Sequence, residues 1–134
     1  PAGAVQEGPS SWSYNEHPDP IEHRLVVLQN SNVSISEDLR LSSILFHDHF
    51  DCSNGVFSVN LYSPESKQMS IVVRYLDLNH YYALSINGPG QSLRLYKMYD
   101  GNAEVLAMVD RVLTVKTWYR FKIVFYLDNI QVWL

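Results

Sequence analysis

The fold is decided by the stretch from Met69 to Leu134, which reads MSIVVRYLDLNHYYALSINGPGQSLRLYKMYDGNAEVLAMVDRVLTVKTWYRFKIVFYLDNIQVWL. Its apolar runs are each about one strand long. They are separated by the turn-forming segments Asp77-Leu78-Asn79-His80, Asn87-Gly88-Pro89-Gly90 and Asp100-Gly101-Asn102. Apolar runs that alternate with Asn, Asp and Gly turns are typical of antiparallel hairpins. The stretch therefore predicts an antiparallel sheet.

Period-2 alternation marks two further strand faces, in residues 56–63 and 119–125. In the first segment Phe57, Val59 and Leu61 fall on one face. In the second segment the residues predicted to face inward are Tyr119, Phe121, Ile123 and Phe125. Leu25–Leu28 and Ser43–Phe46 are read as short strands, and the apolar residues on both faces of 70–75 predict a central strand. Because no segment has a convincing helical period, an all-β, antiparallel two-sheet sandwich is expected.

Two parts are distinguished along the chain. Residues 1–20 are rich in Pro, Gly and Ser and have no period, so we expect a loose arm in which Trp12 and Tyr14 are docking points. Residues 21–134 are expected to form one domain. Its last strand, Ile130–Leu134, ends without a following turn, so we expect the closing strands to be absent. A protein partner or a second chain is expected to complete that edge.

Composition excludes several classes of function. A hydrophobic content of 46% with 13% aromatic residues indicates a folded domain, and no apolar run reaches the ~20 residues that cross a bilayer. The basic residues form no dense cluster, so nucleic-acid binding is not expected. Four basic side chains on strands are predicted to point outward into solvent, with a weak basic stripe for acidic glycans as the alternative: Arg74, Arg94, Arg120 and Lys122.

The segment Ile71–Leu84 resembles a hairpin of the concanavalin A-like lectin/glucanase superfamily, in particular its laminin-G-like and pentraxin-like jelly rolls. The resemblance continues through Ser92–Lys97 and Trp118–Ile123, in the order of that family. It implies a jelly-roll sandwich that is commonly secreted. The superfamily includes glycan binders, protein-binding adhesion modules and glycosidases, so the resemblance alone does not select one function. Its members usually continue past the strand matching Ile130–Leu134.

Aromatic side chains near turn amides provide the components of a carbohydrate site, because sugars stack on aromatic faces while amides bind their hydroxyls. The candidate ligand-binding residues are Tyr75, Asn79, Tyr81, Asn87, Tyr96 and Tyr99. The alternative is ordinary cross-strand packing of the tyrosines.

The segment His47-Asp48-His49-Phe50-Asp51 is the densest group of metal-ligand residue types. Asp48 and Asp51 could offer oxygen atoms to calcium, His47 and His49 could bind zinc with ligands from elsewhere, or the segment is a solvated strand end. No cofactor is required by this reading.

Cys52 is the only cysteine, so no disulfide forms within the chain. It is read either as a buried free thiol or as a candidate for an interchain disulfide. The triplet Asn32-Val33-Ser34 has the form of a glycosylation acceptor at Asn32, in a predicted surface loop.

Catalysis is not expected, because the two glutamates flanking an aspartate on one strand, as found in retaining glucanases of the superfamily, have no counterpart here. The expected function is a non-catalytic, extracellular recognition or adhesion module that binds a protein partner, as part of a larger secreted or surface assembly. The alternative is a lectin-like, carbohydrate-binding domain, with calcium as a contributor.

Overall fold

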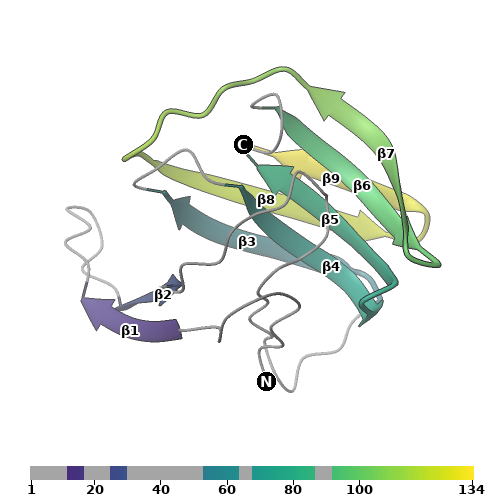
Figure 1. Cartoon of the computed structure of the whole chain (residues 1–134), viewed down its shortest axis with the longest axis horizontal. Helices are drawn as coiled ribbons and strands as arrows, with labels where there is room; N and C mark the ends of the chain where they lie inside the picture. Colours follow the sequence, from purple (N-terminus) through teal and green to yellow (C-terminus); the bar gives the residue numbers. More distant parts are fainter. Residues whose placement is uncertain (1–11, 17–24, 30–52, 64–67, 87–91) are drawn as a thin grey trace. The chain divides into compact units, whose positions relative to one another are not determined.

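The structure, a computed structural model, describes residues 12–16, 25–29, 53–63, 68–86 and 92–134 (Figure 1). The chain divides into two compact units, Pro1–Asp48 and His49–Leu134. The sequence places the division after residue 20 instead. Because β2 (Leu25–Gln29) pairs with β1 (Trp12–Glu16), these segments fall together in the first unit.

In the first unit, β1 and β2 form an antiparallel pair with the register Trp12↔Gln29 to Glu16↔Leu25. The predicted strand at Leu25–Leu28 is therefore confirmed. Within the predicted N-terminal arm, Trp12–Glu16 form a strand. The reason is main-chain pairing with a segment nine residues and more away in sequence, which local composition does not reveal.

The second unit contains two antiparallel sheets (Figure 1). The strands are β3 (Gly55–Tyr62), β4 (Met69–Asp77), β5 (His80–Ile86), β6 (Leu93–Tyr99), β7 (Asn102–Val109), β8 (Trp118–Tyr126) and β9 (Asn129–Trp133). One sheet has the order β4-β5-β6-β7 and the other has the order β3-β8-β9. No helix occurs in the described residues. The predicted all-β, antiparallel two-sheet sandwich is confirmed.

The hairpin turns follow from turn chemistry. Asp100 and Gly101 have φ of 48° and 74° and join β6 to β7, as a type I′ Asp-Gly turn requires. In the β4–β5 turn the Asn79 backbone N–H donates to Asp77 Oδ1 at 2.8 Å, the local bond that makes aspartate a turn former. The predicted hairpins at both positions are thus confirmed.

The core lies between the two sheets. Its buried members are Ile71, Val73, Leu84, Ile86, Leu113, Phe121, Ile123 and Phe125. Three of these, Phe121, Ile123 and Phe125, are inward residues predicted from the alternation of β8. On the predicted shared face of β3, Val59 and Leu61 pack against the core and Phe57 is exposed. Burying such side chains contributes about 1.5–3 kcal/mol each, so β8 supplies a large share of the stabilisation of the sandwich.

Strand β4 departs from the prediction. Among the described strands it lies at one end of its sheet, and the central positions belong to β5 and β6. Its register shifts after Val73, where Arg74 has a φ of 51°. A β-bulge of this kind bends an edge strand and redirects a side chain, here that of Arg74.

Candidate functional site

No described segment packs over the side chains of strand β7. It is the only strand with described side chains in which every residue is exposed. Its larger apolar side chains, Val105, Leu106, Met108 and Val109, are each between 45% and 58% exposed. A contiguous apolar strand at a sheet edge is unusual on a monomer surface and typically marks an interaction site.

The strand counts of the two sheets explain this exposure. Met69 of β4 and Leu61 of β3 line the same small cavity, so β3 lies opposite β4. Counting along both strand orders from this pair, β8 faces β5 and β9 faces β6. Strand β7 is fourth in its sheet and meets no fourth described strand in the other. Consistently, no residue of β7 belongs to the core cluster.

The inner face of β7 follows from the register. Core residue Leu84 pairs with Leu95, which pairs with Ala107, and Leu93 pairs with Val109. Directly paired residues share a face. Leu95, Ala107 and Val109 therefore form an apolar floor, which we call the β6–β7 floor.

An ion pair bounds this floor. Lys97 Nζ lies 3.1 Å from Glu104 Oε2, and the two residues are also register partners on the inner face. The hydrogen bond that Lys97 donates to Glu104 is the main cause that raises the pKa of Lys97. The floor is thus apolar toward the end of β7 and polar toward the β6–β7 turn.

Strand β9 forms the wall beside the floor. It pairs with β8 from Lys122↔Trp133 to Tyr126↔Asn129, and its other edge has no partner strand among the described residues. Ile130 and Val132 pack against the core, while Gln131 and Trp133 are exposed. No residue of β9 carries a charge, and a charge is one of the devices that protect an edge from pairing. The predicted strand at the C-terminal edge is therefore present.

The turn end of the sandwich is closed by Arg74, in contrast to the open edge. Its Nε donates to the Ser53 carbonyl at 3.0 Å and its Nη2 donates to the Leu127 carbonyl in the β8–β9 turn. Its guanidinium carbon lies 5.8 Å from the Phe125 ring centroid. The prediction that Arg74 points into solvent is wrong, because the bulge turns it toward the other sheet. Arg120 and Lys122 are exposed as predicted, and Arg94 is half-buried.

His80 joins two hairpin turns at the same end. Its Nδ1 lies 2.8 Å from Asp77 Oδ1 and its Nε2 lies 2.9 Å from Asp100 Oδ1. The hydrogen bonds that His80 donates to Asp77 and to Asp100 raise the pKa of His80, and the bond to Asp77 has the larger effect. The same bond to Asp77 is the main cause that lowers the pKa of Asp77. An imidazole that meets a carboxylate at each nitrogen donates twice only when it is protonated.

The predicted ligand-binding residues fall into separate environments. Tyr81 and Tyr96 are buried and pack edge to face with centroids 6.1 Å apart, so packing accounts for these two rings. The half-buried Tyr75 stacks on Tyr81 at 6.1 Å. Asn79 and Tyr99 are exposed at the turn end, where His80 contacts the Tyr99 ring edge-on. Asn87 lies outside the described residues.

Several predicted sites also lie outside the described residues. They are the metal candidates Asp48 and Asp51 with His47 and His49, the glycosylation candidate Asn32 and the disulfide candidate Cys52. Within the described ranges, no group of three or more His, Cys, Asp or Glu side chains is placed to hold a metal ion. In the same ranges, no helix is long and apolar enough to cross a membrane.

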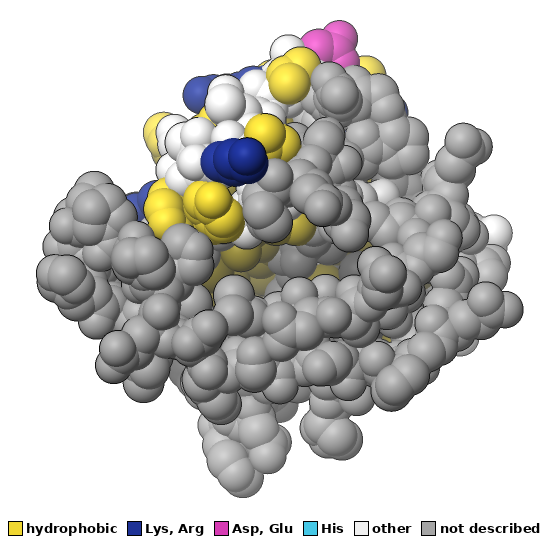
Figure 2. Space-filling view, turned by 60° about the vertical axis from the view of Figure 1, so that its left-hand side comes forward, with side chains coloured by type: hydrophobic (Ala, Val, Ile, Leu, Met, Phe, Trp, Pro, Cys, Tyr) yellow, Lys and Arg dark blue, Asp and Glu magenta, His cyan; other side chains and the backbone are white. Residues whose placement is uncertain are grey.

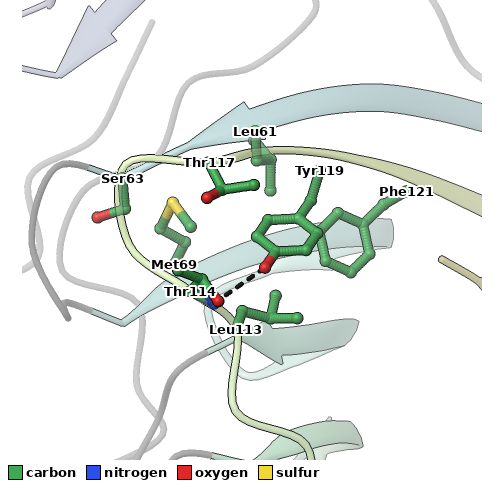
Figure 3. A pocket seen from close by; sticks show the side chains of 8 residues that line it. All are labelled: Leu61, Ser63, Met69, Leu113, Thr114, Thr117, Tyr119 and Phe121. Atoms are coloured by element: carbon green, nitrogen blue, oxygen red, sulfur yellow. Dashed lines mark hydrogen bonds between the residues drawn. The ribbon is translucent and has the colours of Figure 1, made fainter.

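A small cavity opens at the end of the sandwich opposite the turn end (Figure 3). Leu61, Met69, Leu113 and Phe121 form its apolar wall, and the Tyr119 hydroxyl beside it accepts a 2.9 Å hydrogen bond from the Thr114 backbone N–H. The space of about 230 Å³ includes open solvent. Small-molecule sites usually enclose about 300–1,000 Å³, so we read this cavity as an imperfectly filled end of the core.

The described residues visible in Figure 2 show no cluster of basic side chains. In the view of Figure 2, Lys and Arg side chains of the described residues are separated by hydrophobic and neutral ones. Sequence reasoning identified β9 as an edge but missed the β6–β7 floor and the roles of Arg74 and His80. The signal for His80 was its place three residues after Asp77, which is a familiar turn spacing. Comparison with family models, curated proteins and solved structures finds no match to this chain.

Proposed function

We propose that this protein is a non-catalytic recognition module that binds a protein partner at the β9 edge. The single observation that carries the proposal is the mismatch of three strands facing four, which leaves β7 exposed and β9 unpaired on one side among the described residues. A sheet edge recognises another polypeptide through main-chain hydrogen bonds, with specificity from alternate side chains.

The proposal includes the kind of assembly to which this module belongs. An adhesion or recognition module of a larger secreted or surface assembly fits the resemblance to laminin-G-like domains and the acceptor triplet at Asn32. A hydrolase is disfavoured by the chemistry at hand. The exposed carboxylates of Asp77 and Asp100 are both engaged with His80 at an open turn end, not paired across a cleft.

The test uses two alanines of β7 that lie on opposite faces. Ala107 pairs with Leu95 on the inner face, whereas Ala103 pairs with Met98 on the outer face, and both are exposed. Random peptides displayed on phage are selected on the wild-type chain and then measured against Ala107→Lys and Ala103→Lys. We expect the selected peptides to bind wild type and Ala103→Lys and to lose at least about tenfold in affinity for Ala107→Lys, equivalent to roughly 1.4 kcal/mol.

Two outcomes contradict the proposal. One is the absence of any enriched peptide. The other is equal binding to both lysine variants, which would place recognition elsewhere. Binding of a hydrophobic dye gives a further check, because an open apolar edge predicts that the wild-type chain binds the dye. A monomer that binds no hydrophobic dye at any concentration would count against an open site.

Carbohydrate binding at the turn end is the second candidate. It is favoured by Tyr99, which is 60% exposed and lies among the polar side chains of Asn79 and Asp100, in turns held together by His80. A glycan array probed with wild type and Tyr99→Ala, with and without a chelator, tests it. Signals that vanish in Tyr99→Ala support this candidate, and identical signals for both proteins exclude it. Dependence on the chelator would report the calcium contribution.

A further inference from the structure

Resting on the proposed function, we infer that the segment bound at β9 is a single extended strand whose alternate side chains are small and apolar and fill the space over the β6–β7 floor. The main chain sets the first requirement. An unpaired strand edge presents alternating N–H and C=O groups, and only another extended segment satisfies them in register. The five residues of β9 and the eight of β7 set the length of such a strand.

The floor sets the second requirement. Packed sheets lie about 10 Å apart, so side chains from both layers must meet to exclude water. Beneath the added strand the four-stranded sheet presents Leu95, Ala107 and Val109, without charge. Residues of the strand that point inward must therefore be apolar, whereas those beside Gln131 and Trp133 face solvent and are polar.

The Lys97–Glu104 ion pair sets a third requirement. It lies on the same inner face, toward the β6–β7 turn, at 3.1 Å. An apolar side chain packed against this ion pair would remove water from both charges without adding a polar partner, which is unfavourable. The strand is thus apolar over Ala107 and Val109 and becomes polar where it approaches Glu104.

A second copy of this chain does not meet these requirements through its own β9. Ile130 and Val132 of that copy already pack on its own core. If β9 of the second copy paired with β9 of the first, β7 of the first copy would have to lie beneath β9 of the second copy. That space is already filled by the second copy's own four-stranded sheet. The fitting occupant is an extended strand that carries no facing sheet of its own on that side.

The inference is tested by adding a strand in cis to the full chain. A two-residue Asn-Gly turn and a strand of alternating Val and Thr are appended after Leu134, so that the strand folds back beside β9. In the in-phase version, Val occupies the odd positions, which pair with the inward residues Ile130 and Val132. The matched control has the same composition with Val at the even positions, because a shift of one residue moves every side chain to the other face.

We expect the in-phase fusion to melt at least about 5 °C above the out-of-phase fusion. We also expect slower amide hydrogen exchange in β9 and β7. Ala107→Lys should abolish this gain in the in-phase fusion, whereas Ala103→Lys should retain it. Equal melting temperatures and equal exchange for the two fusions would overturn the inference, as would a gain that Ala107→Lys leaves intact.

This outcome is separable from that of the proposed function. An in-phase gain without any peptide selected in trans would uphold the inference about the floor and remove the recognition role. Peptides that bind in trans and lose affinity for Ala107→Lys, but show no alternation of apolar and polar residues, would leave the proposed function in place and remove the inference.

Discussion

Strands β7 and β8 have similar lengths and apolar contents but differ in the burial of their side chains. β7 has eight residues, six of them apolar, and all are exposed. β8 has nine residues, and its Phe121, Ile123 and Phe125 are almost completely buried. β8 has a neighbour on each side and a sheet facing it, whereas β7 pairs with β6 alone among the described strands. The comparison teaches that burial is decided by what faces a strand, not by its own hydrophobicity.

The largest expected effect comes from truncating the buried strand. Phe121→Ala removes a ring that is 0% exposed, so we expect a loss of about 3–5 kcal/mol in the free energy of unfolding. Leu106→Ala in β7 is the matched control and should change it by no more than about 0.5 kcal/mol. Urea titration followed by tryptophan fluorescence measures both. Similar losses for the two variants would mean that β7 is covered in solution.

Arg74 links the two sheets, because its side chain, on β4, donates a hydrogen bond to the β8–β9 turn. Substituting it tests how much this link adds to the stability of the sandwich. Arg74→Lys keeps the charge but cannot reach the Ser53 and Leu127 carbonyls with a planar fork, so we expect a loss of about 1–2 kcal/mol. Arg120→Lys, on the exposed side of β8, serves as the control and should be nearly silent. If both variants unfold at the same denaturant concentration, the bonds of Arg74 do not hold the sheets together.

A substitution at Gly101 tests whether the β6–β7 turn holds β7 on its sheet. Its φ is 74°, and a Cβ at this position would lie 3.3 Å from Asn79 Oδ1. Gly101→Ala should therefore cost about 1 kcal/mol through backbone strain. Because β7 is joined to the sheet through this turn, we expect faster amide exchange in β7 and unchanged exchange in β8. Equal acceleration in both strands would show that they open as one unit.

The smallest effect concerns pH. The pKa of His80 is raised, so its contribution to stability is complete below the unfolded value of about 6.5 and is lost as the pH rises through the higher folded value. The pKa of Asp77 is lowered, so its contribution is present above the unfolded value and is lost as the pH falls through the lower folded one. The bridge is thus strongest in mildly acidic solution.

We expect amide exchange in the two bridged turns, corrected for its intrinsic pH dependence, to increase modestly between pH 6 and 9 in wild type. His80→Gln removes the titrating group and should abolish that dependence. Tyr99→Phe, which keeps the neighbouring ring, should retain it. Persistence of the pH dependence in His80→Gln would assign it to another group.

Local sequence determined much of this protein. Alternation in 119–125 predicted which β8 side chains are buried, and Asp100-Gly101 predicted a hairpin, because side-chain period and turn chemistry act between residues close in sequence. The same reasoning located the strand that ends near Leu134. It could not rank β4 as an edge or β7 as uncovered, since their apolar patterns match those of buried strands.

Only the tertiary structure decided the rest. Arg74 and Leu127 lie 53 residues apart, and His80 and Asp100 lie 20 apart, so their bonds exist only once the sheets are assembled. The β6–β7 floor likewise depends on how many strands face each other, which is a property of the pairing order. Whether a segment forms a strand is decided by local sequence, whereas its exposure is decided by long-range packing. The candidate site of this protein is defined by exposure, so only the tertiary structure reveals it.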